Sequence, residues 1–142
     1  MGYLADVNFL VALLHASHEQ SARAARWLED RKPAPSIGLC HVTQIGLLRV
    51  LTNRSWLKSE VRSAAEVWSA WDALLADDRF VFLAEPSRLD REWRRLTGSL
   101  ATGKMVETDS YLAAFARSAR LTLLTFDAGV RRFPGLAVEV PT

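Results

Sequence analysis

The chain has 142 residues, of which 49% are hydrophobic and 24% are charged, and its formal net charge is +2. These values are typical of a globular protein and exclude a disordered or fibrous chain, so we expect a single domain over residues 1–142. The only cysteine, Cys40, excludes an internal disulfide and a cysteine-based zinc site, and it favours a reducing, cytoplasmic setting.

The N-terminal run "MGYLADVNFLVALL" contains two polar residues, Asp6 and Asn8, in an otherwise almost unbroken apolar stretch. The run has no basic stretch before it, no small-residue cleavage site and too few apolar residues to span a bilayer, so we expect neither secretion nor a membrane span. Its pattern predicts a buried strand followed by a buried helix. A buried carboxylate costs free energy unless it is paired, so Asp6 requires a partner.

Strand-like runs and helical patterns alternate along the rest of the chain. Strands are expected at residues 2–5, 36–39, 80–83, 121–125 and 137–140. Helices are expected over "SARAARWLED", "HVTQIGLLRVLTN", residues 59–76, "RLDREWRRL", "TDSYLAAFARSAR" and "AGVRRF". This alternation predicts an α/β fold with a parallel sheet that is covered on both faces.

The helical patterns also predict caps and buried faces. Capping residues are expected at Ser17 (with Gln20), Ser87 and Thr108. One buried face is expected at Val42, Ile45, Leu48 and Leu51, and another at Val61, Ala64, Ala65, Trp68, Trp71 and Leu75.

Three aspartates follow or precede predicted strands at positions where chemistry is expected. Asp6 ends the first strand, Asp127 follows "LTLLTF", and Asp109 lies in the first turn of the helix before that strand. In an open parallel sheet the functional crevice lies beyond the carboxyl ends of the strands, so these carboxylates are expected to converge. Like charges in one crevice raise each other's pKa values, and a divalent cation removes that penalty. Oxygen ligands without a cysteine or histidine set favour Mg²⁺ or Mn²⁺.

The ordered motifs "LADVNFLVALL", "VTQIGLLRVLT", "TDSYLAAFA" and "LLTFDAGVRRFPGL" resemble those of PIN-domain ribonucleases, in particular the VapC toxins of bacterial toxin–antitoxin pairs. The resemblance covers nearly the whole chain. It implies a three-layer α/β/α sandwich with a central, mostly parallel sheet, and metal-dependent cleavage of RNA. It also implies that Asp6, Asp109 and Asp127 are the metal-binding acids, that Thr125 borders the site and that Asn8 supports Asp6.

One position departs from the family pattern. Where the family usually has a glutamate, this chain has Gln44, whose neutral oxygen removes one negative charge from the site. Glu107 could replace that charge, and Gln44 and Thr125 would then orient ligands. Arg49, five residues beyond Gln44, is expected to contact phosphate or an acid.

Arginines cluster at residues 88–95 and 131–132, and arginine matches phosphate geometry, so RNA is a permitted partner. The residues expected to hold the RNA backbone are Arg49, Arg94, Arg95, Lys104 and Arg131. The family resemblance further implies a VapB-like antitoxin and a homodimer, for which Trp56, Trp68 and Trp71 would offer apolar surface.

Two alternatives remain open from the sequence. The first is a PIN-fold protein that binds RNA or a protein partner but has lost activity, with Gln44 marking the altered site. The second is a phospho-receiver domain, which shares the length, the α/β alternation and acids at strand ends. A receiver would have a lysine after a late strand, and this chain has none there.

Overall fold

The computed structural model describes residues 2–103 and 106–142. Five strands form one sheet in which every pairing is parallel. The strands are β1 (Tyr3–Ala5), β2 (Ile37–Leu39), β3 (Phe80–Phe82), β4 (Thr122–Leu124) and β5 (Val138–Glu139). Each of them lies within a predicted strand, and the mostly parallel sheet that we expected is parallel throughout.

The strand order β3-β2-β1-β4-β5 determines where a functional crevice can form. The chain builds outward from β1 through β2 to β3, and then returns to the other side of β1 with β4 and β5. The order of the strands therefore reverses between β1 and β4, and ligands bind beyond the carboxyl ends of the strands at such a point. Receiver domains have the flavodoxin-like order 2-1-3-4-5, so this topology excludes the phospho-receiver alternative.

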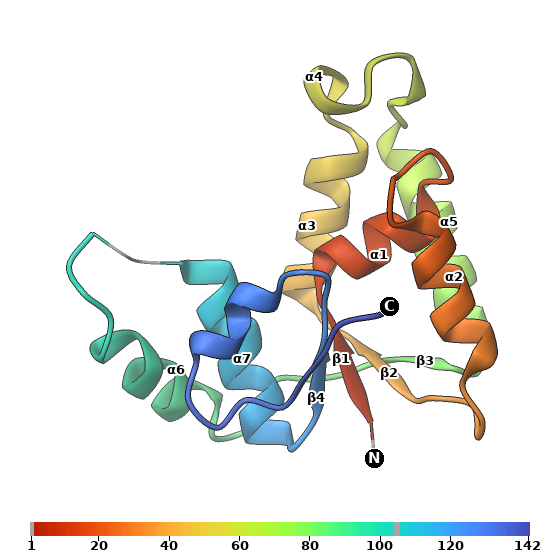
Figure 1. Ribbon diagram of the computed structural model, residues 1–142. Helices are drawn as coiled ribbons and strands as arrows, with labels where there is room; N and C mark the ends of the chain where they lie inside the picture. Colours follow the sequence, from red (N-terminus) through yellow and green to blue (C-terminus); the bar gives the residue numbers. More distant parts are fainter. Residues whose placement is uncertain (1, 104–105) are drawn as a thin grey trace.

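Helices cover both faces of the sheet, which gives the expected three-layer α/β/α sandwich (Figure 1). One face is covered by α1 (Val7–Leu14), α2 (Ser21–Asp30), α3 (His41–Leu51) and α5 (Ala64–Ala76). The other face is covered by α6 (Leu89–Gly98), α7 (Glu107–Ala119) and the short 3₁₀ helix η2 (Ala128–Arg132). The short helices α4 (Arg54–Leu57) and η1 (Lys58–Glu60) connect α3 to α5 at the end of a projecting arm. Among the described residues no helix is both long enough and apolar enough to span a membrane.

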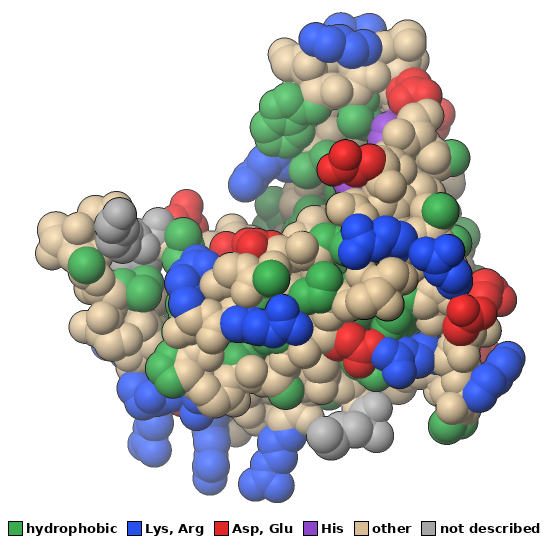
Figure 2. Space-filling model, in the orientation of Figure 1, with side chains coloured by type: hydrophobic (Ala, Val, Ile, Leu, Met, Phe, Trp, Pro, Cys, Tyr) green, Lys and Arg blue, Asp and Glu red, His purple; other side chains and the backbone are tan. Residues whose placement is uncertain are grey.

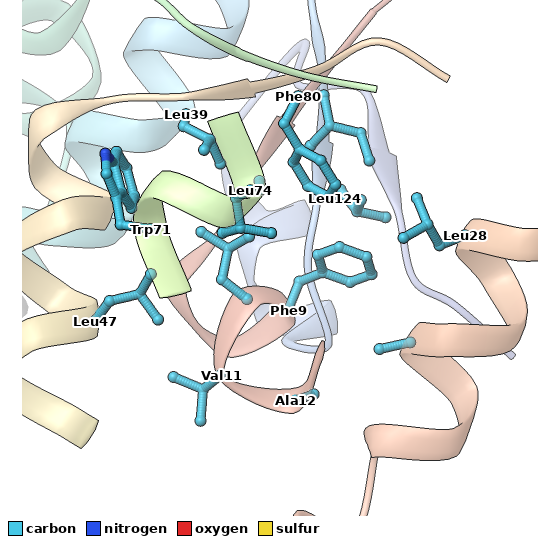
Figure 3. Packing of buried hydrophobic residues seen from close by; sticks show 14 of the residues in the cluster. Phe9, Val11, Ala12, Leu28, Leu39, Leu47, Trp71, Leu74, Phe80 and Leu124 are labelled. Carbon is cyan, nitrogen blue, oxygen red and sulfur yellow. The ribbon is translucent and has the colours of Figure 1, made fainter. Parts of the chain in front are cut away.

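Two hydrophobic clusters hold the layers together. Because neighbouring strand residues point to opposite faces, Leu124 packs with Phe9, Trp71 and the other helices of the first layer, while Leu123 packs against α6 and α7. Figure 3 shows Phe9, Phe80 and Leu124 converging between α1 and the sheet. This packing fixes β1 against β4, and thus sets the position of the residues that follow both strands.

The helix predicted over residues 59–76 begins later than expected. Its first predicted turns are η1 and an extended segment, and α5 starts at Ala64. Ser63 and Glu66 form a reciprocal capping box there, which terminates the helix on its N-terminal side. The buried face of α5 is Val67, Trp71 and Leu74, so the predicted stripe was wrong except at Trp71.

The predicted buried face of α3 is correct at Leu51 and wrong at Ile45, and three predicted caps were wrong. In α3 the buried residues are Thr43, Leu47 and Leu51, whereas Ile45 is 54% exposed. The Ser17 hydroxyl donates to Glu60 Oε1 (2.6 Å) instead of capping α2. The residues before α6 and α7 are Arg88 and Val106, so neither Ser87 nor Thr108 occupies a cap position.

Candidate active site

The three predicted acids lie at the end of the sheet where the strand order reverses. Asp6 follows β1 and caps α1, Asp127 follows β4 and caps η2, and Asp109 lies in the first turn of α7. Asp6 is 6% exposed, Asp109 is partly buried and Asp127 is exposed. The fold thus brings together carboxylates from three elements that are distant in the sequence.

A polar network holds Asp6 in place. Its Oδ2 accepts a hydrogen bond from the Thr125 hydroxyl (2.8 Å) and a longer one from Asn8 Nδ2 (3.4 Å), and its Oδ1 accepts from the backbone N–H of Val7 (2.7 Å). The Asn8 side chain also accepts from the backbone N–H of Phe126 (2.9 Å) and donates to Thr125 Oγ1 (3.0 Å). Thr125 and Asn8 therefore act where the family resemblance implied, and they join the residues after β1 to those after β4.

The electrostatics of the site disfavour three ionised acids. Burial raises the pKa of Asp6, and the negative charges of Asp109 and Asp127 raise it further, although the hydrogen bonds from Thr125 and Val7 oppose this change. The pKa of Asp109 is also raised, first by burial and then by Asp127. The described contacts of Asp6 include no cationic side chain. Its protein partners stabilise the carboxylate only partly, and a bound cation would offset the remaining cost.

Among the described residues, Arg132 forms an ion pair with one of these acids, and the sequence analysis did not select it. Its guanidinium lies 3.7 Å from Asp109 Oδ2, and it donates to the backbone carbonyl of Gly129 (2.6 Å). The Gly129 N–H in turn donates to Asp127 Oδ1 (2.9 Å). Because a 3₁₀ helix has three residues per turn, Gly129 and Arg132 lie on the same face of η2. The three-residue spacing between Gly129 and Arg132 could have indicated in the sequence that Arg132, and not Arg131, lies on the same side of η2 as the backbone group that contacts Asp127.

A pocket of about 610 Å³ opens beside the acids. Its polar lining includes Asp6, Asn8, Thr108, Asp109 and Arg49. The apolar lining comes from α1, α3 and α4: Val7, Val11, Val42, Ile45, Val50 and Trp56. Trp56 is 59% exposed, and His18 also lines the pocket, although no sequence pattern pointed to either of them as a pocket residue.

Gln44 and Glu107, the two candidates for a further metal ligand, lie in different surroundings. Gln44 does not line the pocket, and its side-chain oxygen is hydrogen-bonded with the His41 ring (3.0 Å). Glu107 is exposed at the start of α7 and contributes a negative field at Asp109. Gln44 and Glu107 were the two candidates for the extra ligand. Of these, Glu107 raises the pKa of Asp109, whereas Gln44 is neutral and is hydrogen-bonded to His41.

The residues predicted to bind RNA lie on different elements. Arg131 is exposed on η2, next to the acids in sequence. Arg94 and Arg95 lie on α6, where they pair with Asp90 (2.7 Å) and Glu92 (2.6 Å). Lys104 lies outside the described residues.

The donor set fits a divalent metal ion that keeps part of its water shell. Within residues 2–103 and 106–142, no group of three or more His, Cys, Asp or Glu side chains could hold a metal ion by itself. Asp6 and Asp109 nevertheless line one pocket, and the negative charge of Asp127 raises the pKa values of both. Hard oxygen ligands that are completed by water are the arrangement that Mg²⁺ prefers.

Comparisons with known proteins agree with this geometry. Residues 3–136 match the model of the PIN domain family. The ribonuclease VapC41 of Mycobacterium tuberculosis is 34% identical over 141 residues, which cover 96% of this chain and 97% of that protein. The ribonuclease VapC38 of the same species is 35% identical over 127 residues, which cover 89% of this chain and 86% of that protein.

Solved structures have the same fold at low sequence identity. VapBC-1 from nontypeable Haemophilus influenzae superposes with a TM-score of 0.75 at 15% identity, over 99% of this chain and 98% of that one. VapC20 of Mycobacterium tuberculosis, described as a Sarcin-Ricin loop cleaving toxin, gives a TM-score of 0.71 at 14% identity, over 96% of this chain and 97% of that one. At these identities the likeness concerns the fold alone.

Proposed function

Since the chain belongs to the PIN domain family, we propose that it is an endoribonuclease that acts as the toxin of a toxin–antitoxin pair. The observation that carries this proposal is the placement of Asp6, Asp109 and Asp127. They come from three elements at the open end of a parallel sheet, and the negative charge of Asp127 raises the pKa values of both Asp6 and Asp109. Such a site can hold a divalent ion beside a phosphodiester group.

Asp6, Asp109 and Asp127 would hold one or two Mg²⁺ or Mn²⁺ ions, directly or through water. When bound, the ion supplies Lewis acidity that activates water and neutralises charge on the leaving oxygen. The chain's own residues prepare this site: Thr125 and Asn8 orient the Asp6 carboxylate, and Gly129 holds that of Asp127. No histidine base is required.

Cationic groups beside the acids would hold the RNA backbone. Arg49 lines the same pocket as Asp6 and Asp109, and its guanidinium matches the geometry of phosphate oxygens. Arg132 is already paired with Asp109, so it screens the acids when no ion is present. A phosphate that enters the pocket would thus lie between Arg49 and the acid cluster.

The apolar part of the pocket supports a VapB-like antitoxin as partner. Structures of related fold are titled as VapBC complexes, among them that from Haemophilus influenzae. Val11, Ile45 and Trp56 line a continuous path from the acids to α4. A partner segment that packs there would also cover Asp6 and Asp109, which would block access of RNA to the acids.

A homodimer is supported by the edge strand β3. Val81 is 43% exposed and Phe82 is 37% exposed, although β3 stands at the edge of the sheet. Exposed apolar residues on an edge strand are a surface that proteins usually cover. A second copy of the chain would cover both residues, while Trp71 belongs to the core and is not available for this contact.

The test of the proposed function is RNA cleavage with Mg²⁺ or Mn²⁺. Asp6→Asn and Asp127→Asn are expected to lower the cleavage rate by at least about a hundredfold, because each removes a charged ligand of the activating ion. Asp72→Asn is the matched control, because Asp72 is an exposed aspartate on α5. It should cleave at the parent rate.

The alternative of an inactive RNA-binding or partner-binding protein predicts a different result. In that case the parent protein would bind RNA but would not cleave it with either ion. Equal cleavage by the parent and both aspartate variants would instead contradict the assigned roles of Asp6 and Asp127.

A further inference from the structure

A second polar pocket lies at the opposite end of α7 from the acids. It has a volume of about 260 Å³ and is formed where the start of α6 meets the end of α7. Its lining residues are Arg88, Arg91, Glu92, Arg117, Ser118 and Arg120. Figure 2 shows Lys and Arg side chains gathered along this lower edge of the molecule, beneath α6 and the end of α7.

The acidic groups near this pocket are already neutralised. Glu92 is paired with Arg95 (2.6 Å) and Arg117 (2.5 Å), and these two arginines, Arg95 most of all, hold its pKa below the usual range. Asp90 is paired with Arg94 (2.7 Å). In the part of the chain that the structure describes, no ion pair involves the other three arginines of the pocket: Arg88, Arg91 and Arg120. The pocket therefore carries an excess of positive charge.

Arginine is an unfavourable residue type at the positions that these three arginines occupy. Arg88 and Arg91 stand at the start of α6, where the helix dipole disfavours cations and favours anions. Arg120 adopts a left-handed conformation (φ 57°) at the end of α7, a position that glycine or asparagine usually fills. Local rules are most often broken at functional sites, and a bound anion would satisfy the cations and the helix start together.

Ser118 contributes one hydroxyl group to the wall of this pocket. Its hydroxyl is buried, and within the described residues it has no hydrogen-bond partner. Buried hydroxyl groups in native proteins almost always have a partner, and an unsatisfied one often marks an unseen water, ion or ligand. The Ser118 Oγ has almost no accessible surface of its own, so the charge of the three arginines, and not this hydroxyl, is what would attract an anion to the pocket.

We propose that this pocket binds a phosphate group of the RNA backbone at a second site, remote from the acid cluster. The proposal rests on the ribonuclease function proposed above. Asp109 and Ser118 are separated by about 14 Å along α7, at 1.5 Å per residue. One RNA molecule that reaches both ends of this helix would be held in two places, so the second site would favour structured RNA over very short oligonucleotides.

The test measures binding of a fluorescently labelled RNA hairpin by anisotropy over a series of salt concentrations. All variants carry Asp6→Asn to prevent cleavage. Arg91→Gln with Arg120→Gln is expected to weaken binding roughly tenfold, and to lower the slope of log K against log salt by about 0.7 to 0.9 for each lost phosphate contact.

The control removes two positive charges elsewhere. Arg26→Gln with Lys32→Gln changes two exposed residues that do not line this pocket, and it should leave the affinity within about twofold of the parent. Equal affinity and slope for the parent and the Arg91/Arg120 variant would overturn the proposal. It would also be overturned if inorganic phosphate raised the melting temperature of the parent but not of this variant while both bound the hairpin equally, because the pocket would then take a small phosphate.

The two proposals fail in distinguishable ways. If the protein with Asp6 intact cleaves RNA but the arginine variant binds the hairpin like its parent, only the second site is wrong. If that protein does not cleave RNA with Mg²⁺ or Mn²⁺ but hairpin binding still depends on Arg91 and Arg120, the second site stands and the ribonuclease function is wrong.

Discussion

Asp6 illustrates how a single residue links the fold to its chemistry. Its carboxylate interrupts an apolar run, and the sequence alone shows that it needs a partner. The structure supplies Thr125, Asn8 and the N–H of Val7, but it surrounds these contacts with two further carboxylates. The hydrogen bonds keep Asp6 in a fixed orientation, and the repulsion leaves it ready to accept a cation.

The raised pKa values of Asp6 and Asp109 predict opposite effects of pH with and without metal. Because the folded state holds protons more tightly than the unfolded state, the free energy of unfolding of the metal-free protein should fall as pH rises from about 4, the ordinary value, through the raised pKa values. The proposed Mg²⁺ site requires ionised acids, so the increase in melting temperature caused by Mg²⁺ should be largest near neutral pH and shrink as the pH is lowered. Thermal melts at several pH values, with Mg²⁺ or with EDTA, measure both effects.

Saturating Mg²⁺ at a hundred times its dissociation constant would stabilise the folded protein by roughly 2.7 kcal/mol. Asp6→Asn serves as the comparison, since it removes one of the charged ligands and should lose most of this gain. A gain of equal size at every pH would contradict an acidic metal site at Asp6 and Asp109.

At the scale of elements, the sequence predicted the strands better than the helix boundaries. The strands are short and mostly apolar runs, and this pattern is local. The start of α5 depends instead on Ser63 and Glu66, whose capping box ends the helix although Val61 continues the apolar pattern. The buried face of α3 was predicted correctly at Leu51 but not at Ile45, which lines the pocket and is not part of the core.

Ser63→Ala tests whether this capping box determines where α5 begins. The substitution removes the hydroxyl that accepts from the Glu66 N–H (3.1 Å), so the free energy of unfolding should fall by about 0.5–2 kcal/mol. Ser69→Ala, at an exposed position within α5, should change it much less, because alanine favours a helix interior. Urea unfolding followed by circular dichroism gives both values, and an equal change in the two variants would rule out the cap as the determinant.

At the scale of the whole molecule, the order of the strands creates the site. The sequence placed three acids at the ends of elements, but only the reversal between β1 and β4 brings them to one edge. The side chains around them could not be predicted in the same way. Arg132 and Trp56 lie near the acids because of the way η2 and α4 are oriented. These orientations depend on tertiary packing and not on the local sequence pattern.

The proposed homodimer predicts that a charge on the edge strand separates the subunits. Val81→Arg places a cation on the exposed face of β3, and it should convert a dimer into a monomer in light scattering coupled to size-exclusion chromatography. Thr102→Arg adds the same charge at an exposed position outside β3 and should leave the dimer intact. If Val81→Arg remains a dimer, the contact lies elsewhere on the surface.

The hydrogen bonds between the two ends of the chain also affect when activity can arise during translation. Thr125 and Asp6, which share a hydrogen bond, are 119 positions apart, and Phe126 and Asn8 are 118 apart. The first of these residues leave the ribosome long before the last are made, since synthesis proceeds from the N-terminus. A nascent chain therefore cannot complete the acid cluster, so cleavage activity should arise only when synthesis is almost finished.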